Sequence, residues 1–397
     1  MSSQLRPVDE VIAHLLDKVT PLTETRTVKL EDALGHYLAS DITSSIDVPP
    51  AANSAMDGYA VISAEISEAE LYDISARIPA GSVGEAIVAG TIVRIFTGAQ
   101  IPPGADAVVI QENTERVGDQ VRINVVPDRG ENIRPQGQDI SAGSIILKRG
   151  KRLQPQDLSL AASVGKSQVE IFRPLKVSIL STGDELVDPP GPTGPGQIYN
   201  SNRFALAGML QDLGMEVVDL GIVADTLEAT EEALRAGAEQ SDCIVSTGGV
   251  SVGEEDYVKD VVERLGSLDI WRIAIKPGKP LAFGDVMGTP FFGLPGNPVS
   301  TFITFAIVAR PYLIAYQGGS EIQATCYSGE AEFGHKAGSR REYLRVQTYL
   351  EDGRVKLRKF PTQGSGVMSS VSWANALAEI EVGQSVIPGD QLKFLSL

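Results

Sequence analysis

The fold is decided by residues 243–265, which read CIVSTGGVSVGEEDYVKDVVERL. The opening CIVST is small and β-branched and predicts a buried strand, and the apolar spacing of residues 257–265 predicts a helix. A glycine-rich turn joins the two and runs into three consecutive acidic residues, 254–256. A strand, a glycine turn and a helix in this order are typical of an α/β domain built on parallel strands.

The same alternation continues on both sides of this stretch. Before it, strands are expected over residues 175–180 and 215–223, with a helix over 203–214 between them. After it, a strand is expected over 269–275, short apolar runs follow, and a helix begins at Pro298. In a parallel sheet wrapped by helices the ligand sits at the carboxyl ends of the strands, where the glycine-rich and acidic motifs of this chain fall.

Two other regions have a β-rich texture. Residues 57–127 form short strand-like runs between glycine, proline and acidic turns, which predicts a small β-rich domain. Residues 131–173 return to a mixed texture and are expected to pack beside the helix predicted over 7–19, which would make the β-rich domain an insertion. After the glycine pair at 318–319, further strand-like runs predict a small C-terminal barrel or sandwich.

Composition bounds the classes of function. A chain of 397 residues exceeds one ordinary core and predicts several domains. The net charge of −17 argues against a general binder of nucleic acids or membrane surfaces, so an anionic ligand would need its own local cations or N–H groups. Cys243 and Cys326 have no metal-site spacing, and neither a signal peptide nor a membrane-spanning stretch is recognisable, so we expect a cytoplasmic protein.

The glycine turn after residue 247 raises the question of its ligand. Its glycines are not spaced as in a dinucleotide fingerprint, and Glu254 occupies the position of the P-loop lysine. Taken alone, the turn fits better with a tight strand-to-helix connection whose acidic residues favour the helix N-terminus. Carboxylates also follow the two preceding strands, however, at STGDEL (181–186) and at Asp225. Acids after three neighbouring strands would repel one another, which a divalent cation such as Mg²⁺ would relieve while N–H groups hold substrate phosphates.

Two basic or turn-rich motifs follow. KPGKP (276–280) places two lysines on a turn stiffened by prolines, which suits a phosphate or a small tetrahedral oxyanion, although a solvated turn is the simpler interpretation. GLPGNPVS (293–300) ends in the first turn of a helix, whose free N–H groups also favour anions. Asn297 and Pro298 also suit a plain helix start.

Six ordered motifs carry a resemblance to a known family: NSAMDGYA (53–60), TGAQIPPGADAVV (97–109), STGDEL, GGVSVGEEDY (248–257), KPGKP and GLPGNPVS. Together they resemble the molybdopterin molybdenumtransferase family of the bacterial MoeA type, which is related to the E domain of gephyrin. The resemblance implies a multidomain α/β plus β fold. Its expected parts are an elongated mixed domain (1–46 and 135–173), an inserted β-rich domain (47–134), a central α/β domain of adenylyltransferase-like (MogA/MoaB-type) fold (174–318) and a C-terminal β-barrel (319–397).

The resemblance also implies a reaction. Adenylylated molybdopterin and molybdate would give the molybdenum cofactor and AMP, with Mg²⁺ or another divalent cation present. It implies a cytoplasmic homodimer whose active site is shared between subunits, and contact with the molybdopterin adenylyltransferase, without nucleic acid or membrane. Two alternatives stay open, namely adenylyl transfer from ATP to molybdopterin and a scaffold or interaction protein of gephyrin type.

The family's functional residues map onto the motifs of this sequence. Catalytic roles would fall to Asp57, Thr97, Glu185, Asp225 and Asp256, and Glu185, Asp225 and Asp256 would hold the metal. Of these, Asp57 and Thr97 would act across the dimer. Molybdate contacts are expected from Lys276, Lys279, Ser300, Arg341 and Ser369. The remaining expected substrate-binding residues are Ser181, Thr182, Gly183, Asp184, Gly248, Gly249, Ser251, Gly253, Pro295 and Asn297.

Overall fold

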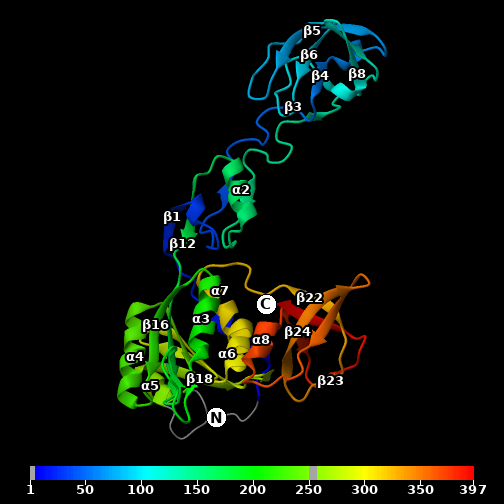
Figure 1. The fold of residues 1–397 in the computed structure, drawn as a ribbon. Helices are drawn as coiled ribbons and strands as arrows, with labels where there is room; N and C mark the ends of the chain where they lie inside the picture. Colours follow the sequence, from blue (N-terminus) through cyan, green and yellow to red (C-terminus); the bar gives the residue numbers. More distant parts are fainter. Residues whose placement is uncertain (1–4, 250–256) are drawn as a thin grey trace.

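A computed structural model describes residues 5–249 and 257–397 of the chain. The molecule is elongated (Figure 1). A β-rich unit lies at one end, a narrow neck follows, and the base holds an α/β unit and a barrel side by side. The expected multidomain α/β plus β architecture is confirmed, while the exact domain boundaries stay predictions.

The α/β unit is built on a six-stranded, mostly parallel sheet in the order β16-β13-β17-β21-β20-β18. Its parallel pairings join β16, β13, β17 and β21, whereas β20 runs antiparallel to both β21 and β18. The strands are β13 (Lys176–Thr182), β16 (Glu216–Val223), β17 (Cys243–Thr247), β18 (Gly266–Arg272), β20 (Pro280–Val286) and β21 (Thr289–Leu294). The carboxyl ends of β13, β16, β17 and β21 therefore meet at one edge, which is where the predicted motifs lie.

Helices cover both faces of this sheet. On one face α4 (Leu227–Gln240) packs against α5 (Tyr257–Leu265) over a core that includes Leu234 and Val261. The other face carries α3 (Ser201–Asp212), α6 (Pro298–Thr304), a π-helical stretch (Phe305–Ala309) and α7 (Arg310–Tyr316). The run Pro298–Tyr316 is long and apolar enough to cross a membrane, but 72% of its most apolar window is buried inside the protein. That burial is typical of a core helix.

The neck is made where two distant segments pair. β1 (Thr25–Lys29) runs antiparallel to β12 (Gln168–Phe172), β2 (Ile42–Thr43) to β11 (Ile145–Leu147), and β3 (Asn53–Ser54) to β10 (Ile133–Arg134). The short helix α2 (Pro155–Ser163) completes it. The segment that leads into the β-rich unit therefore pairs with the segment that leads out of it, as expected for an inserted domain.

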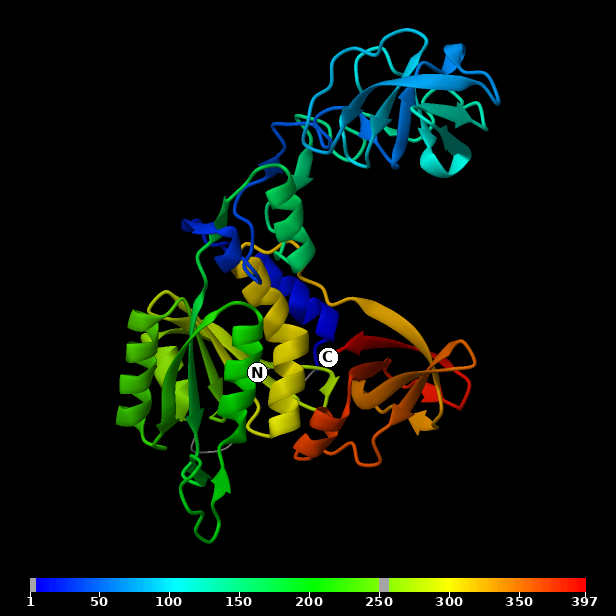
Figure 2. The ribbon, with the colours of Figure 1, turned by 45° about the horizontal axis from the view of Figure 1, so that its top comes forward.

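The partner of the returning segment differs from the expectation. Its strand β12 pairs with β1, whereas the N-terminal helix α1 (Val8–Asp17) packs against α7 in the base (Figure 2). The reason is the apolar stripe of α1, which buries Val8, Val11 and Leu15 in the core of the α/β unit.

The β-rich unit and the barrel each have their own core. The β-rich sheet has the order β7-β4-β6-β5-β9-β8. Its strands are β4 (Gly58–Val61), β5 (Leu71–Ile78), β6 (Thr91–Ile95), β7 (Ala107–Ile110), β8 (Thr114–Val117) and β9 (Gln120–Ile123). In the C-terminal region, pairing of β24 with β26 closes five strands into a barrel. These are β22 (Cys326–Ala331), β24 (Arg341–Glu351), β25 (Arg354–Lys359), β26 (Ala376–Ile380) and β28 (Gln391–Ser396).

One short strand ties the barrel to the α/β unit. β19 (Ile275–Lys276) pairs in parallel with β24, with Ile275 opposite Arg341 and Lys276 opposite Glu342. The KPGKP turn therefore leaves directly from the barrel edge and enters β20 of the α/β sheet. This connection places the turn between the two units.

Gly318 should be indispensable at the end of α7. It has a φ of +87°, and a Cβ there would lie 2.5 Å from the ring of Phe172. We expect Gly318→Ala to lower the free energy of unfolding by about 2 kcal/mol or more, because the left-handed backbone and the ring both oppose the methyl group. Denaturant titration should be compared with Gly165→Ala, which has a φ of +80° but open space around the added Cβ. Equal losses in the two variants would contradict the contact with Phe172.

Candidate active site

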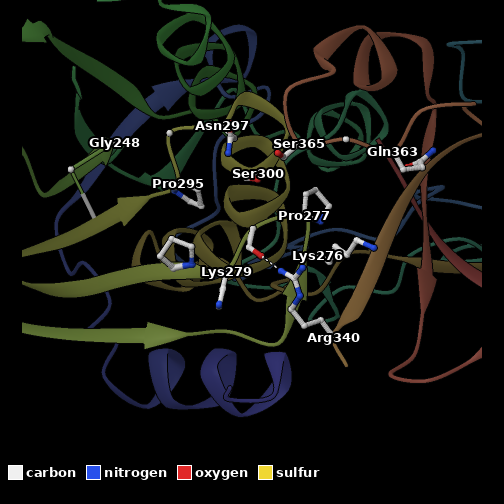
Figure 3. Close-up of a pocket in the computed structure, with 15 residues that line it drawn as sticks. Gly248, Lys276, Pro277, Lys279, Pro295, Asn297, Ser300, Arg340, Gln363 and Ser365 are labelled. Atoms are coloured by element: carbon white, nitrogen blue, oxygen red, sulfur yellow. Dashed lines mark hydrogen bonds between the residues drawn. The ribbon is translucent and has the colours of Figure 1, made fainter. Parts of the chain in front are cut away.

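A cavity of about 580 Å³ lies between the α/β unit and the barrel. It sits at the carboxyl ends of β17 and β21, against the KPGKP turn and the start of α6, and two barrel segments close it (Figure 3). Its lining residues are Gly248, Gly249, Lys276, Pro277, Gly278, Lys279, Pro280, Pro295, Gly296, Asn297, Ser300, Arg340, Gln363, Gly364 and Ser365.

Lys276 reaches a buried carboxylate. Its Nζ lies 3.0 Å from Oε1 of Glu342, a side chain that is only 2% exposed. Glu342 also accepts a 3.2 Å hydrogen bond from the N–H of Gly338, and its Oε2 lies 2.9 Å from Nε2 of His335. Although burial opposes ionisation, these hydrogen bonds hold the pKa of Glu342 below its ordinary value. The Lys276 ammonium is therefore fixed, and much of its charge is compensated.

Lys279 and Arg340 are the uncompensated cations of the cavity. Neither forms an ion pair with any residue that the structure describes. The Nη1 atom of Arg340 instead donates to the carbonyl oxygen of Gly278 at 2.7 Å (Figure 3) and to that of Ile275 at 3.1 Å. In a chain with a net charge of −17, two such cations in one cavity favour an anionic ligand there.

Two glycines bring the end of β17 close to β13. Gly248 and Gly249 have φ values of +86° and +64°. A Cβ on Gly248 would lie 2.7 Å from the carbonyl oxygen of Thr182, and one on Gly249 would lie 2.4 Å from Val258. Only glycine fits at both positions, whereas the rest of the predicted turn lies outside the described residues and its contact with a phosphate stays a prediction.

The acidic residues after β13 and β16 meet beside this turn. The N–H of Asp225 donates to Oδ1 of Asp184 at 3.3 Å. Glu185 folds back, so that a Cβ on Gly183 would lie 2.5 Å from its Oε2. Within residues 5–249 and 257–397, no group of three His, Cys, Asp or Glu residues could hold a metal ion. Mg²⁺ commonly uses only one or two carboxylates together with substrate phosphates, so the Asp184 carboxylate beside the backbone of Asp225 is compatible with such a site.

Several predicted residues lie elsewhere. Ser181 and Thr182 are buried behind the turn, where the Ser181 hydroxyl lies 3.1 Å from that of Thr247. Both guanidinium NH₂ groups of Arg341 donate to Asp9 at 2.8 Å, so this arginine does not line the cavity. Ser369, an exposed residue of α8 (Met368–Trp373), does not line it either. Ser251, Gly253 and Asp256 lie outside the described residues.

Arg340, Gln363, Gly364 and Ser365 take the places expected for Arg341 and Ser369. Arg340 lies just before β24 and is held against the KPGKP turn by its hydrogen bonds to Ile275 and Gly278, whereas Arg341 is the first residue of β24 and pairs with Asp9. Gln363 and Ser365 were missed by sequence reasoning. The sequence signal for these residues is QGSG (363–366), a polar stretch with the same glycine-rich texture as GLPGNPVS.

Asp57 and Thr97 meet in the β-rich unit. The N–H and the hydroxyl of Thr97 donate to Oδ1 of Asp57 at 2.7 and 2.8 Å. The backbone and then the side-chain hydrogen bond from Thr97 lower the pKa of Asp57 below its ordinary value, so the carboxylate is ionised at neutral pH. Asp57 directly precedes β4 and Thr97 follows β6, and this β-rich unit lies at the opposite end of the molecule from the α/β unit and the barrel (Figure 1).

Glu342→Gln should destabilise the barrel edge. We expect a loss of about 1–3 kcal/mol at neutral pH, because Lys276 and His335 lose a buried charged acceptor. The folded-state pKa of Glu342 lies below its unfolded value, so its contribution is fully present above about pH 4.3 and is lost as the pH falls through the folded-state value. Urea titrations at neutral and acidic pH measure this difference.

A matched control for this variant is Glu332→Gln. Glu332 is 32% exposed, pairs with Arg358 and accepts a hydrogen bond from the Tyr349 hydroxyl that a glutamine oxygen can also accept, so we expect the substitution to cost less than about 1 kcal/mol. A neutral-pH loss no larger for Glu342→Gln than for Glu332→Gln would contradict the buried ion pair.

Comparisons with known proteins cover almost the whole chain. Residues 6–165 match the family described as MoeA N-terminal region (domain I and II). Residues 178–315 match a probable molybdopterin binding domain, and residues 331–397 match the MoeA C-terminal region (domain IV).

Individual relatives are similar over the same length. A molybdopterin molybdenumtransferase of Haemophilus influenzae is 38% identical over 379 residues, which cover 94% of each chain. One from a Nostoc species is 34% identical over 397 residues and covers 96% of this chain and 91% of that protein. The crystal structure of a molybdopterin biosynthesis MoeA protein from Pyrococcus horikoshii has a TM-score of 0.85 at 28% identity, covering 99% of this chain and 100% of that one.

Proposed function

This chain belongs to the molybdopterin molybdenumtransferase family, and we propose how its residues serve molybdenum insertion. The protein is a transferase of molybdenum cofactor biosynthesis. The reaction joins molybdate to adenylylated molybdopterin and releases AMP. The main support for placing the molybdate site is the pair of uncompensated cations, Lys279 and Arg340, in the cavity between the α/β unit and the barrel.

The cavity is proposed to bind molybdate. Molybdate is a tetrahedral dianion, and Lys279 and Arg340 supply charge while the hydroxyls of Ser300 and Ser365 supply donors around it. Lys276 contributes less, because Glu342 already compensates it at 3.0 Å. Binding the oxyanion beside the substrate pterin gives the positional advantage of an intramolecular reaction.

The acidic edge is proposed to hold Mg²⁺ or another divalent cation. Asp184 and Asp225 lie together there, and Glu185 and Asp256 belong to the same predicted set. When bound, the cation neutralises phosphate charge and polarises the phosphorus. Gly248 and Gly249 line the cavity and pass close to Thr182. Because they carry no side chain, they leave room for the substrate to extend from the acidic edge to the oxyanion.

A cytoplasmic homodimer is part of the proposal. Asp57 and Thr97 would complete the site of the partner subunit, because a C2 dimer places the same pair of surfaces together twice. The two free cysteines, one buried and one exposed, are consistent with a reducing compartment. Contact with the molybdopterin adenylyltransferase would pass the adenylylated pterin on directly.

The decisive experiment measures AMP release from adenylylated molybdopterin with and without molybdate. Molybdate-dependent release, together with formation of the cofactor, is the expected result. Consumption of ATP in the presence of molybdopterin, without AMP release from the adenylylated pterin, would favour the adenylyltransferase alternative instead.

A further inference from the structure

Arg345 is a buried arginine that the proposed reaction does not yet use. It lies on β24 and is 1% exposed. Its neighbours Leu344 and Val346 point into the barrel core, so Arg345 points to the opposite side of the strand. Burial lowers the pKa of Arg345 to about 10, which leaves it charged at neutral pH.

Every hydrogen bond of this guanidinium goes to a neutral acceptor. Nε donates to the Ser370 hydroxyl at 3.0 Å, Nη2 to the carbonyl oxygen of Gly364 at 3.1 Å, and Nη1 to that of Tyr343 at 3.4 Å. In the part of the chain that the structure describes, it forms no ion pair. Burying a charge without a counter-ion costs several kcal/mol, and an apolar side chain would fill the space at lower cost.

The same residue holds one wall of the cavity through its backbone. Its N–H donates to Oε1 of Gln363 at 2.9 Å, and its carbonyl oxygen accepts from Nε2 of Gln363 at 3.1 Å. Gln363, Gly364 and Ser365 all line the cavity. The carbonyl oxygen of Ser365 in turn accepts from the N–H of Val299 at 3.0 Å, next to Ser300.

We propose that Arg345 is a positioning residue of the oxyanion cavity, which fixes the wall 363–365 and adds a buried positive charge whose counter-ion is the bound molybdate. The proposal rests on the proposed function of the cavity. It explains why a charge is retained at this place, because a dianion in the adjacent cavity compensates it. A purely structural role would instead be to hold α8 and the turn against the barrel.

The two roles separate in a titration of molybdate at saturating adenylylated pterin, with AMP release as the signal. For Arg345→Met we expect the half-saturating molybdate concentration to rise about fivefold, with less than about a twofold change in the rate at saturation. Arg345→Lys keeps the charge without the fork of donors and should fall between wild type and Arg345→Met. It also serves as the test if the methionine variant does not fold.

Two controls isolate the effect. Leu357→Ala opens a hole in the same barrel core, where Leu357 is fully buried, and should lower the melting temperature without moving the half-saturating concentration. Arg358→Met removes an arginine of 59% exposure from the same barrel and should change neither. A wild-type half-saturating concentration in both Arg345 variants, or an equal shift in Leu357→Ala, would overturn the proposal.

The same titration of Lys279→Gln distinguishes a failure of the role proposed for Arg345 from a failure of the proposal that the cavity binds molybdate. If Lys279→Gln shifts the half-saturating concentration and the Arg345 variants do not, only the role of Arg345 is wrong. If none of them shifts it, the cavity itself is not the molybdate site.

Discussion

Lys279→Gln should raise the molybdate concentration for half-maximal AMP release by about tenfold to a hundredfold. Lys279 lines the cavity and has no carboxylate partner within the described residues, so its full charge is available to the oxyanion. Glutamine keeps most of the length of the side chain and removes only the charge. A charge-assisted hydrogen bond of this kind is worth about 1.5–3 kcal/mol.

The measurement is a molybdate titration at saturating adenylylated pterin. The affinity for the pterin should change much less, because the acidic edge and the glycine turn are left intact. Lys336→Gln is the matched control, since Lys336 is an exposed lysine of the barrel that does not line the cavity. An unchanged half-saturating concentration in a folded Lys279→Gln protein would mean that the oxyanion binds elsewhere.

Local sequence patterns predict the fold class of the α/β unit, because the strands and helices there can be recognised from the spacing of apolar residues over short stretches. The strand at 243–247 and the helix at 257–265 lie where periodicity predicted them. The sequence predicts either a barrel or a sandwich for the C-terminal region, because closure of the barrel depends on the pairing of β24 with β26. The partner of α1 was also not predictable, because an apolar stripe specifies burial without specifying the surface that buries it.

The motifs of the candidate site could be predicted from the sequence, but the contacts between their side chains and distant residues could not. Lys276 and Lys279 are equivalent in the sequence KPGKP, yet only Lys276 reaches the buried Glu342, which lies 66 positions further along the chain. The choice of Arg340 over Arg341 likewise depends on where β24 begins and on Asp9, at the other end of the chain. Such choices follow from tertiary contacts between distant segments, which no local spacing encodes.

In the proposed homodimer, Asp57→Asn and Asp225→Asn should each reduce activity by about a hundredfold or more, and the two variants should complement each other when mixed. Asp57 is ionised and held by Thr97 in the β-rich unit, far from the cavity of its own chain. If it acts in the partner's site, a dimer of one Asp57→Asn chain and one Asp225→Asn chain keeps one intact composite site. Its other site carries both substitutions.

Co-expression with two different affinity tags, followed by tandem purification, isolates the mixed dimer. Its activity should return to about half that of the wild-type dimer, because one of its two sites is intact. A mixed dimer of Asp57→Asn and Thr97→Ala is the matched control and should stay inactive, since both substitutions lie in the β-rich unit and each damages a different site. If the first pair forms mixed dimers that remain as inactive as the control, the shared site is wrong. Asp57 would then act within its own chain or only hold the turn before β4 in place.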